Sequence, residues 1–407
     1  MVEATSLLSA NAVRERAHKL LALGLDNRLP HFRVDLAKLD AVADLVLTVT
    51  QKAYPTGDIP FHSRWRHFVV DGADRWAGIA DRGTWPDAAA RARAEFDLAI
   101  TSVLLDAGAG PAWRYHDAAT GKQIGRSEGL ALASLDMFVR GAFSARTDAP
   151  LRVDAEKLAR LSVGDLERGF QVSADNRLVG LEGRVELLRR LGELIARRPD
   201  VFAIKDGARP GGLFDHLVGR TDKSRIEAPT ILSELLIQFG PIWPSRITLD
   251  GVALGDCWRH PLLASSDGTS DLVPLHKLSQ WMTYSLIEPL QRAGIDVVDI
   301  DGLTGLAEYR NGGLFIDGGV LVLRDADDAA RAHAVDSPLV VEWRALTVAL
   351  LDRLAELIRQ RLGQDAKSLP LAKILEGGTW ATGRKLAFER RTDGSPPLKV
   401  ISDGTVF

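Results

Sequence analysis

Residues 308–313 bring together several kinds of side chain that can do chemistry. In order they supply a carboxylate, a phenol, a guanidinium, an amide and two glycines: Glu308, Tyr309, Arg310, Asn311, Gly312 and Gly313. The glycines allow positive φ or a close approach of the backbone to another group. A carboxylate beside a fixed cation can face a small polar ligand. The alternative is a surface turn with a local Glu–Arg pair, which would contribute little stability.

A single carboxylate of this kind suits the hydrolysis of an N-glycosidic bond. That reaction passes through an oxocarbenium-like transition state, and a carboxylate beside the anomeric carbon stabilises the positive charge or activates the attacking water. Glu308 is the candidate for this catalytic role. Cationic side chains would hold the phosphate or hydroxyl groups of the sugar, and the candidates are Lys277, Arg64 and Arg310.

A second dense segment, residues 61–76, carries basic and aromatic side chains close together. Its candidate substrate-binding residues are His62, Arg64, Arg66 and His67, which can hold a phosphate through charge-assisted hydrogen bonds. The two histidines are five residues apart, which does not fit the i, i+4 spacing of a helical metal site. We therefore expect ligand binding and no metal. The alternative is a strand-like segment with a solvated basic face.

A long helix is predicted over residues 274–294. Lys277, Gln280 and Tyr284 follow one another at i, i+3 and i+7, so they share a face of that helix. The face is polar without being highly charged, which suits the wall of a ligand site. We expect these residues, together with Tyr309, to contact the substrate; the alternative is an ordinary solvated face.

The helix predicted over residues 338–362 is too apolar for the surface, so we expect it to be central. Glu342 and Arg344 lie two apart within it, point in different directions and cannot simply pair with one another. Each needs a partner elsewhere. We expect them, with Asn311, to support Glu308. Arg344 would bond to carbonyls or to a carboxylate near the Glu308 loop, and Glu342 would accept from the same region.

The remaining pattern predicts a mostly α protein with a few short strands. Further helices are expected over residues 9–23, 34–54, 88–105, 130–139 and 185–196. We expect a single domain, 1–407, because no clear linker or repeat divides it. Within it, 1–150 would form an N-terminal helical part that includes 61–76, 151–375 a core, and 376–407 a polar C-terminal wrap or lid.

Composition limits the partners. The chain has 407 residues, 46% of them hydrophobic and 26% charged, with a net charge of -3, which is ordinary for a globular protein. Because the net charge is small, we expect neither a nucleic-acid nor a membrane partner. The single cysteine, Cys257, excludes an intrachain disulfide. With neither a signal-peptide core nor an apolar run long enough to span a membrane, we expect a cytoplasmic protein.

Common catalytic motifs are missing from the sequence. It has no GxSxG elbow, no HExxH helix and no GxGxxG after a strand. Residues 297–305, VVDIDGLTG, resemble the phosphoribosyltransferase loop, in which a hydrophobic strand precedes two acids and a Thr-Gly pair. The match lacks one acid and is one residue short.

Six motifs, in order along the chain, resemble the uracil-catabolism protein family of the ring-opening (non-reductive) pyrimidine degradation pathway. They are HSRWRHF, RSEGLALASLD, RPGGLFDHL, HKLSQWMTYSLIEPL, LTGLAEYRNGGLF and VEWRALTVALLD. The resemblance covers almost the whole chain and implies cleavage of a ureido-ribose intermediate with release of urea. Members of this family are sometimes labelled uracil phosphoribosyltransferase.

The C-terminal half is more distantly similar to the queuosine-salvage nucleotide N-glycosidases. The similar residues are Lys277-Leu-Ser-Gln280, Glu308-Tyr309-Arg310, Gly319-Val320-Leu321 and Glu342-Trp-Arg344-Ala345. This resemblance implies a helical DNA-glycosylase-like fold, and it matches the catalytic Asp of those enzymes with Glu308, which is one methylene longer.

Together these features predict an N-glycosidase that acts on a ribosyl ureide or a pyrimidine-derived nucleoside or nucleotide and releases urea or a ureide. We expect no cofactor, and a small-molecule partner together with other enzymes of the uracil pathway. Two alternatives stay open: phosphoribosyl transfer to uracil, and a non-catalytic helical ligand-binding or partner protein. Convergence of Glu308, Lys277 and residues 62–67 on one closed pocket would disfavour the second alternative, whereas a parallel sheet ending at VVDIDGLTG would favour the first.

Overall fold

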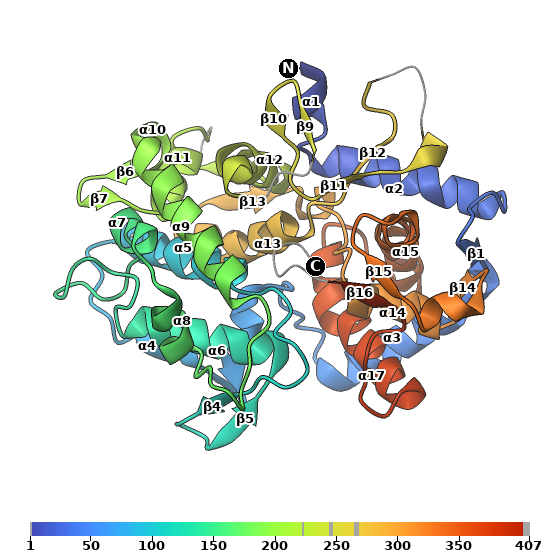
Figure 1. Cartoon of the computed structure of the whole chain (residues 1–407), viewed down its shortest axis with the longest axis horizontal. Helices are drawn as coiled ribbons and strands as arrows, with labels where there is room; N and C mark the ends of the chain where they lie inside the picture. Colours follow the sequence, from blue (N-terminus) through green and yellow to red (C-terminus); the bar gives the residue numbers. More distant parts are fainter. Residues whose placement is uncertain (1, 222–223, 244–246, 264–267, 402–407) are drawn as a thin grey trace.

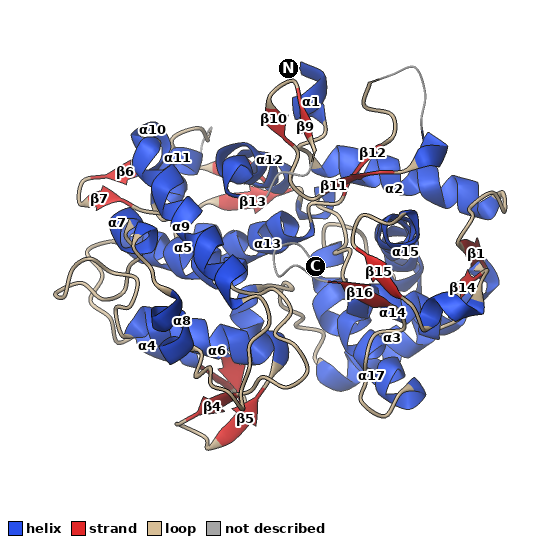
Figure 2. Ribbon diagram, in the orientation of Figure 1, coloured by secondary structure: helices blue, strands red, loops and turns tan. Residues whose placement is uncertain are grey.

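The protein is built mainly from helices. The computed structural model describes residues 2–221, 224–243, 247–263 and 268–401, and Figure 2 shows helices throughout this part of the chain. The long helices are α2 (Ala10–Leu25), α3 (Leu39–Ala53), α5 (Ala88–Leu104), α6 (Arg126–Val139), α9 (Leu181–Arg197), α12 (Ala228–Phe239), α13 (Lys277–Arg292), α14 (Tyr309–Asp317), α15 (Pro338–Leu362) and α17 (Trp380–Arg390). The mostly α class is confirmed, and the likeness to DNA glycosylases stays a prediction.

Short helical segments fill many of the connections. They are α1 (Val2–Ser6), η1 (Leu36–Lys38), η2 (Arg64–Phe68), α4 (Arg75–Ala80), α7 (Ala155–Ala159), α8 (Val163–Gly169), α10 (Pro199–Phe202), α11 (Gly212–Val218), η3 (Gly240–Ile242), η4 (Pro261–Leu263), η5 (Ile300–Gly302), η6 (Ala326–Ala329), α16 (Leu371–Ile374) and the π-helical η7 (Leu375–Thr379). The segment η2 replaces the strand-like alternative considered for residues 61–76.

Strands occur only as pairs in the described ranges. The antiparallel pairs are β1 (Phe32–Val34) with β14 (Leu321–Leu323), β2 (Val69–Val70) with β3 (Ala73–Asp74), β4 (Tyr115–Asp117) with β5 (Lys122–Ile124), β6 (Ala203–Ile204) with β7 (Gly207–Ala208), β9 (Thr248–Leu249) with β10 (Val252–Ala253), and β11 (Cys257–Arg259) with β12 (Leu272–Pro274). The parallel pairs are β8 (Arg225–Glu227) with β13 (Asp296–Val298) and β15 (Ala332–Ala334) with β16 (Lys399–Ile401). The run VVDIDGLTG therefore starts in a two-stranded pairing, not in the larger parallel sheet that would favour a transferase.

Local sequence explains where the main helices start and stop. The hydroxyl oxygen of Ser9 accepts from the backbone N–H of Ala12 (3.2 Å), so Ser9 caps α2, which begins at the next residue. Ser337 caps α15 in the same way. That helix ends at Gly363, whose φ of 63° suits glycine best.

Helix α15 lies at the centre of the C-terminal core, as predicted. Its residues from 339 to 351 are all buried. Figure 1 shows α2 above it and α3 and α17 below it, and α15 contacts α2, α3 and α14. Helices from the two ends of the chain thus pack around α15, while helices from the middle of the chain occupy the other side of the molecule.

Two sequence expectations differ from the structure. The helix expected over residues 34–54 starts only at Leu39, because Phe32–Val34 pairs with a distant strand and Asp35 caps a short 3-10 turn. The expected C-terminal wrap contains a helix, α17, that packs closely against α14. Gly383 makes this approach possible, since a Cβ atom there would lie 2.1 Å from the carbonyl oxygen of Arg310.

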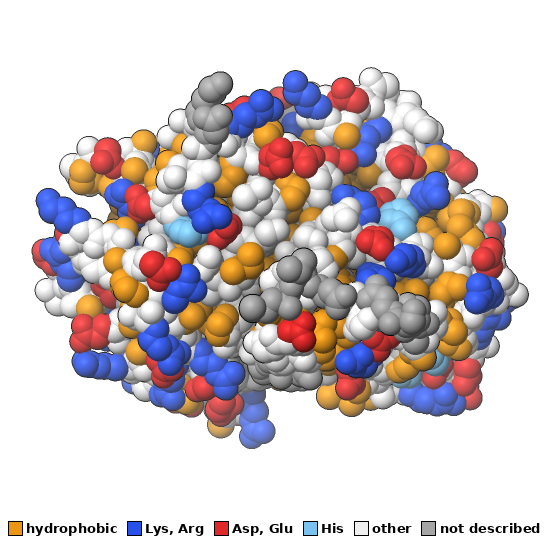
Figure 3. All heavy atoms as spheres, turned by 90° about the horizontal axis from the view of Figure 1, so that it is seen from above, with side chains coloured by type: hydrophobic (Ala, Val, Ile, Leu, Met, Phe, Trp, Pro, Cys, Tyr) orange, Lys and Arg blue, Asp and Glu red, His pale blue; other side chains and the backbone are white. Residues whose placement is uncertain are grey.

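The surface mixes charges of both signs. Figure 3 shows acidic and basic side chains interspersed over one face, with no large area of a single sign. Among the described residues, no helix is both long and apolar enough to cross a membrane.

Candidate active site

Glu308 is held inside the protein at the N-terminus of α14. Its carboxylate accepts hydrogen bonds from the backbone N–H groups of Arg310 (2.7 Å) and Asn311 (2.5 Å). The residue is only 8% exposed. The alternative of a surface turn is therefore wrong: Glu308 is a buried cap with a fixed carboxylate.

Opposing effects act on the pKa of Glu308. Burial raises it, because a charged carboxylate is less stable away from water. The two backbone hydrogen bonds and the nearby charges of Lys277 and His62 lower it, but burial prevails and the pKa lies above its ordinary value. Perturbed carboxylates close to other titratable groups are concentrated at functional sites.

Lys277 is the first residue of α13 and faces the same region. Its backbone N–H donates to Asp256 (3.0 Å). Its Nζ atom has no hydrogen-bond or ion-pair partner within the described part of the chain. Burial lowers the pKa of Lys277, while the negative charges of Asp106 and Glu308 oppose that shift. A desolvated ammonium group without a partner is available to an incoming anion or hydroxyl group.

The loop before Glu308 is gripped by two predicted site residues from α13. The Gln280 amide bonds to both the hydroxyl and the backbone N–H of Thr304. The Tyr284 hydroxyl donates to the Thr304 carbonyl oxygen (2.8 Å). Both side chains are fully buried. Their polar atoms hold Thr304 and so position Glu308, four residues further on; direct contact of either residue with substrate stays a prediction.

Arg344 supports the same loop from α15, as the sequence predicts. Its guanidinium donates to both oxygens of Asp256 (2.8 and 2.7 Å) and to the carbonyl oxygen of Ala307 (3.2 Å). Burial alone would raise the pKa of Asp256, but the charge and hydrogen bonds of Arg344 outweigh it and hold the pKa at about 2. Through its bond to Ala307, Arg344 ties α15 to the residue directly before Glu308.

The expectation for Glu342 is wrong. Its carboxylate lies 3.1 Å from the Nε2 atom of His260 and accepts from the backbone N–H of His31 (3.3 Å). Because α15 turns Glu342 away from Arg344, it reaches these partners instead of the Glu308 loop.

The two arginines of η2 are neutralised inside the protein. Arg64 is fully buried, donates to Ser102 and forms an ion pair with Asp106 (2.8 Å). Arg66 donates to both oxygens of Glu288 (3.0 and 2.7 Å). A carboxylate therefore already balances the positive charge of each arginine, so Lys277 is the better candidate to bind an anionic group of the ligand.

The two histidines of the segment flank one tryptophan. The rings of His62 and His67 lie 4.6 and 5.6 Å from that of Trp281, measured between centroids. His62 Nδ1 lies 2.7 Å from a Glu376 oxygen. Burial and the charge of Arg64 lower the pKa of His67 to about 4, so this ring is neutral at physiological pH.

The residues after Glu308 complete the cluster. Arg310 lies over the ring of Tyr309 (4.9 Å to its centroid) and donates to the carbonyl oxygen of Gly394 (2.8 Å). Asn311 accepts from the Thr379 hydroxyl (2.9 Å), which ties α14 to η7 and agrees with a supporting role.

Several buried donors in this cluster lack an acceptor in the described part of the chain. They are Arg64 Nη2, Trp281 Nε1 and Arg310 Nε. Buried N–H groups usually have a partner, so these three donors are available for hydrogen bonds to other polar groups.

The structure thus brings together most of the predicted site residues. The charges of Lys277 and His62 act on the pKa of Glu308, and those of Asp106 and Glu308 act on the pKa of Lys277. Glu342 is not among them. Sequence analysis missed Asp106, Asp256, Glu376 and Trp281, because their importance comes from contacts between distant segments.

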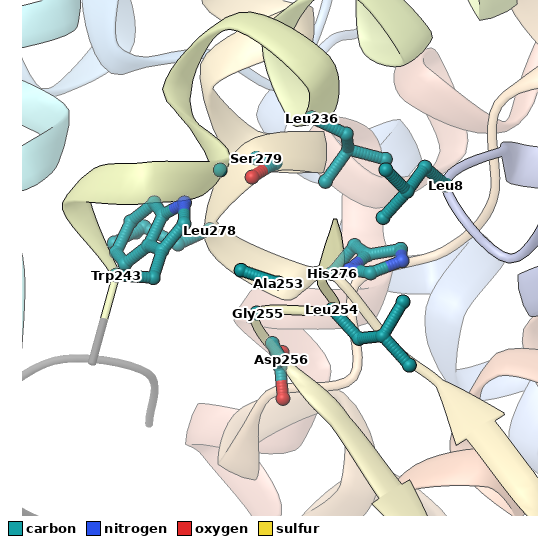
Figure 4. Close-up of a pocket in the computed structure, with 11 residues that line it drawn as sticks. Leu8, Leu236, Trp243, Ala253, Leu254, Gly255, Asp256, His276, Leu278 and Ser279 are labelled. Carbon is teal, nitrogen blue, oxygen red and sulfur yellow. The ribbon is translucent and has the colours of Figure 1, made fainter. Parts of the chain in front are cut away.

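A small cavity lies behind the start of α13 (Figure 4). It is lined by Leu8, Leu236, Gly240, Trp243, Ala253, Leu254, Gly255, Asp256, His276, Leu278 and Ser279. Its volume of about 10 Å³ is enough for at most one water molecule. It is a packing defect behind the Asp256–Lys277 contact and not a ligand site.

Comparisons with known proteins match the whole chain. A family model described as "Protein of unknown function (DUF1688)" matches residues 6–407. The chain is 40% identical over 413 residues to protein urg3 of Schizosaccharomyces pombe, covering 98% of both chains. It is 37% identical over 414 residues to uracil catabolism protein 4 of Lachancea kluyveri, covering 94% of this chain and 93% of the relative. All the site residues named above lie within the region matched by the family model.

Proposed function

The chain belongs to the DUF1688 family, and we propose that it acts in uracil catabolism as an N-glycosidase. Its substrate is a ribosyl ureide or a pyrimidine-derived nucleoside or nucleotide, and its leaving group is urea or a ureide. The pathway is supported by the name of the Lachancea kluyveri relative, uracil catabolism protein 4. The reaction is supported by the chemistry of the cluster around Glu308.

One observation carries the proposal: a buried, backbone-fixed carboxylate, Glu308, lies near an ammonium group, Lys277, that no described residue pairs with. The carboxylate stabilises the oxocarbenium-like transition state or takes a proton from the attacking water. Lys277 holds a hydroxyl or phosphate oxygen of the sugar. The bond between the anomeric carbon and nitrogen breaks, and water adds to that carbon. The departing nitrogen takes up a proton.

The unpaired donors support a polar substrate. Trp281 Nε1 and Arg310 Nε have no acceptor in the described ranges, and the oxygens of a sugar, phosphate or ureide group would provide one. The buried Trp281 ring packs against His62 and His67, so its Nε1–H group is held in place beside them.

The test is to incubate the purified protein with ribosylurea and with its 5′-phosphate and to assay free urea. We expect release of urea and ribose, or ribose 5-phosphate, from at least one of them. Formation of a uracil nucleotide from uracil and phosphoribosyl pyrophosphate, without urea release, would contradict the proposal in favour of the transferase. Tight binding without turnover of either compound would favour the ligand-binding alternative.

A further inference from the structure

We propose that His62 is the acid that protonates the departing nitrogen, and that Glu376 is the positioning residue that orients it. This inference rests on the proposed N-glycosidase function and adds to it the group that supplies the leaving-group proton. It follows from the way the His62 ring is held, and from the atom that this arrangement leaves open.

The His62 ring is constrained on two sides. Its Nδ1 atom lies 2.7 Å from a Glu376 oxygen, so the carboxylate accepts a hydrogen bond from Nδ1–H. One face of the ring lies against Trp281, with the centroids 4.6 Å apart. The backbone N–H of His62 donates to the Ala372 carbonyl oxygen (2.9 Å). With Nδ1 occupied, Nε2 is the atom that can give and take a proton, and no described residue bonds to it.

Glu376 is built into the fold in an unusual way. It lies in the π-helical turn η7, and such turns are frequent at functional sites. Gly377 and Gly378 bring this turn against α3, since a Cβ atom on Gly378 would lie 2.4 Å from the Thr50 hydroxyl oxygen. The hydroxyl of Tyr54, the residue directly after α3, donates to the second Glu376 oxygen (3.0 Å).

These contacts keep Glu376 charged. Burial raises the pKa of Glu376, but the hydrogen bond and charge of His62 outweigh burial and leave the pKa below its ordinary value. An ionised Glu376 accepts a hydrogen bond from Nδ1–H and so fixes the orientation of the ring. This is the part that a carboxylate plays behind a catalytic histidine in general.

His62 and Glu308 act on different parts of the substrate, the leaving nitrogen and the sugar. As the bond from the anomeric carbon to nitrogen breaks, its electron pair goes to the nitrogen, which takes the proton from His62 Nε2. Glu308 faces the positive charge left on the sugar, and water then adds to the anomeric carbon and releases one proton. That proton restores the charged imidazole through solvent, so protons and electrons balance over the cycle.

The experiment compares two leaving groups in one variant. Ribosylurea needs protonation to depart, whereas 4-nitrophenyl riboside does not, so both are assayed, with or without the 5′-phosphate as the wild type requires. We expect His62→Gln to lower kcat on ribosylurea by about 10²-fold or more and on the nitrophenyl compound by less than about 10-fold. Because the ratio of the two rates is taken within one variant, partial unfolding cancels.

Glu376→Gln and a matched control complete the design. Glu376→Gln should show the same preference for the activated leaving group, with a smaller loss. His216 pairs with Glu234 at 3.0 Å, away from the cluster, and His216→Gln should leave both rates unchanged. An equal loss on both substrates, or no loss on either, in an active wild type would overturn the role of His62. A wild type that hydrolyses neither compound would overturn the proposed function itself.

Discussion

At the scale of single residues, two buried carboxylates near the same loop have opposite electrostatics. Asp256 faces both nitrogens of Arg344, and its pKa is held at about 2. Among the described residues, Glu308 has only backbone N–H groups as direct hydrogen-bond partners, and its pKa is raised. Burial raises the pKa of both carboxylates, so the difference between their pKa values comes from their hydrogen-bond partners. Asp256 is thus committed to holding the structure, while Glu308 is left free to respond to a substrate.

Replacing Arg344 tests this division of roles. Arg344→Leu leaves the buried Asp256 carboxylate without its counter-charge, so we expect a loss of about 3–5 kcal/mol in the free energy of unfolding. Chemical denaturation measures it. Arg146→Leu is the control, because its pair with Asp148 is exposed and exposed ion pairs contribute little stability. An Arg344→Leu variant with unchanged stability but no substrate binding would show that Arg344 contacts the ligand.

His67 should make stability depend on pH. Burial and Arg64 hold its folded-state pKa at about 4, so between that value and the unfolded-state pKa the unfolded chain binds more protons. Stability therefore falls as the pH drops from about 6.5 to about 4, by at most about 3 kcal/mol from this residue. His67→Gln should flatten that slope in denaturation curves taken across this window. Parallel curves for the variant and the wild type would rule the effect out.

At the scale of elements, sequence periodicity located the long helices well. The helix expected over residues 88–105 is observed as Ala88–Leu104, and the helix expected over residues 9–23 is observed as Ala10–Leu25. The paired strands and the start of α3 were not predicted, because β1 owes its form to a partner almost the whole chain away. Glu308 and Lys277 lie in local sequence motifs and could be named in advance. Glu376 could not, because its role comes from a contact with a distant segment.

Gly383 tests how closely α17 must approach α14. Since a Cβ atom there would meet the Arg310 carbonyl oxygen at 2.1 Å, Gly383→Ala should cost about 1–3 kcal/mol and disturb the helix that carries Glu308. Gly78 of α4 is the control, because the nearest atom to its added Cβ lies 3.9 Å away. Gly78→Ala should be neutral or stabilising by up to about 1 kcal/mol. Equal unfolding midpoints for the two variants would contradict the close approach.

At the scale of the whole molecule, helices from the two ends of the chain build one core. Helix α15 contacts α2 and α3 from the start of the chain, and α14 contacts α17 from its end. The candidate site also draws on η2 as well as on α13 and α14. We therefore propose that the sub-division at 150 and 375, suggested by the sequence, does not mark independent folding units.

A fragment tests that proposal. Residues 151–375 alone would expose the faces of α15 and α14 that α2, α3 and α17 cover in the full chain. We expect this fragment to lack a cooperative unfolding transition and to bind a hydrophobic dye, unlike the full-length protein. Cooperative unfolding of the fragment would instead identify it as a domain.

The most direct test of the whole account is the turnover of Glu308→Gln. This change keeps the size of the side chain and an acceptor for the α14 backbone, but removes the charge. We predict that kcat for urea release falls by about 10²-fold or more while substrate still binds. Glu389→Gln, at an exposed pair with Lys385, should leave kcat unchanged. A Glu308→Gln variant with near wild-type kcat would contradict the account, because Glu308 would then be only a helix cap.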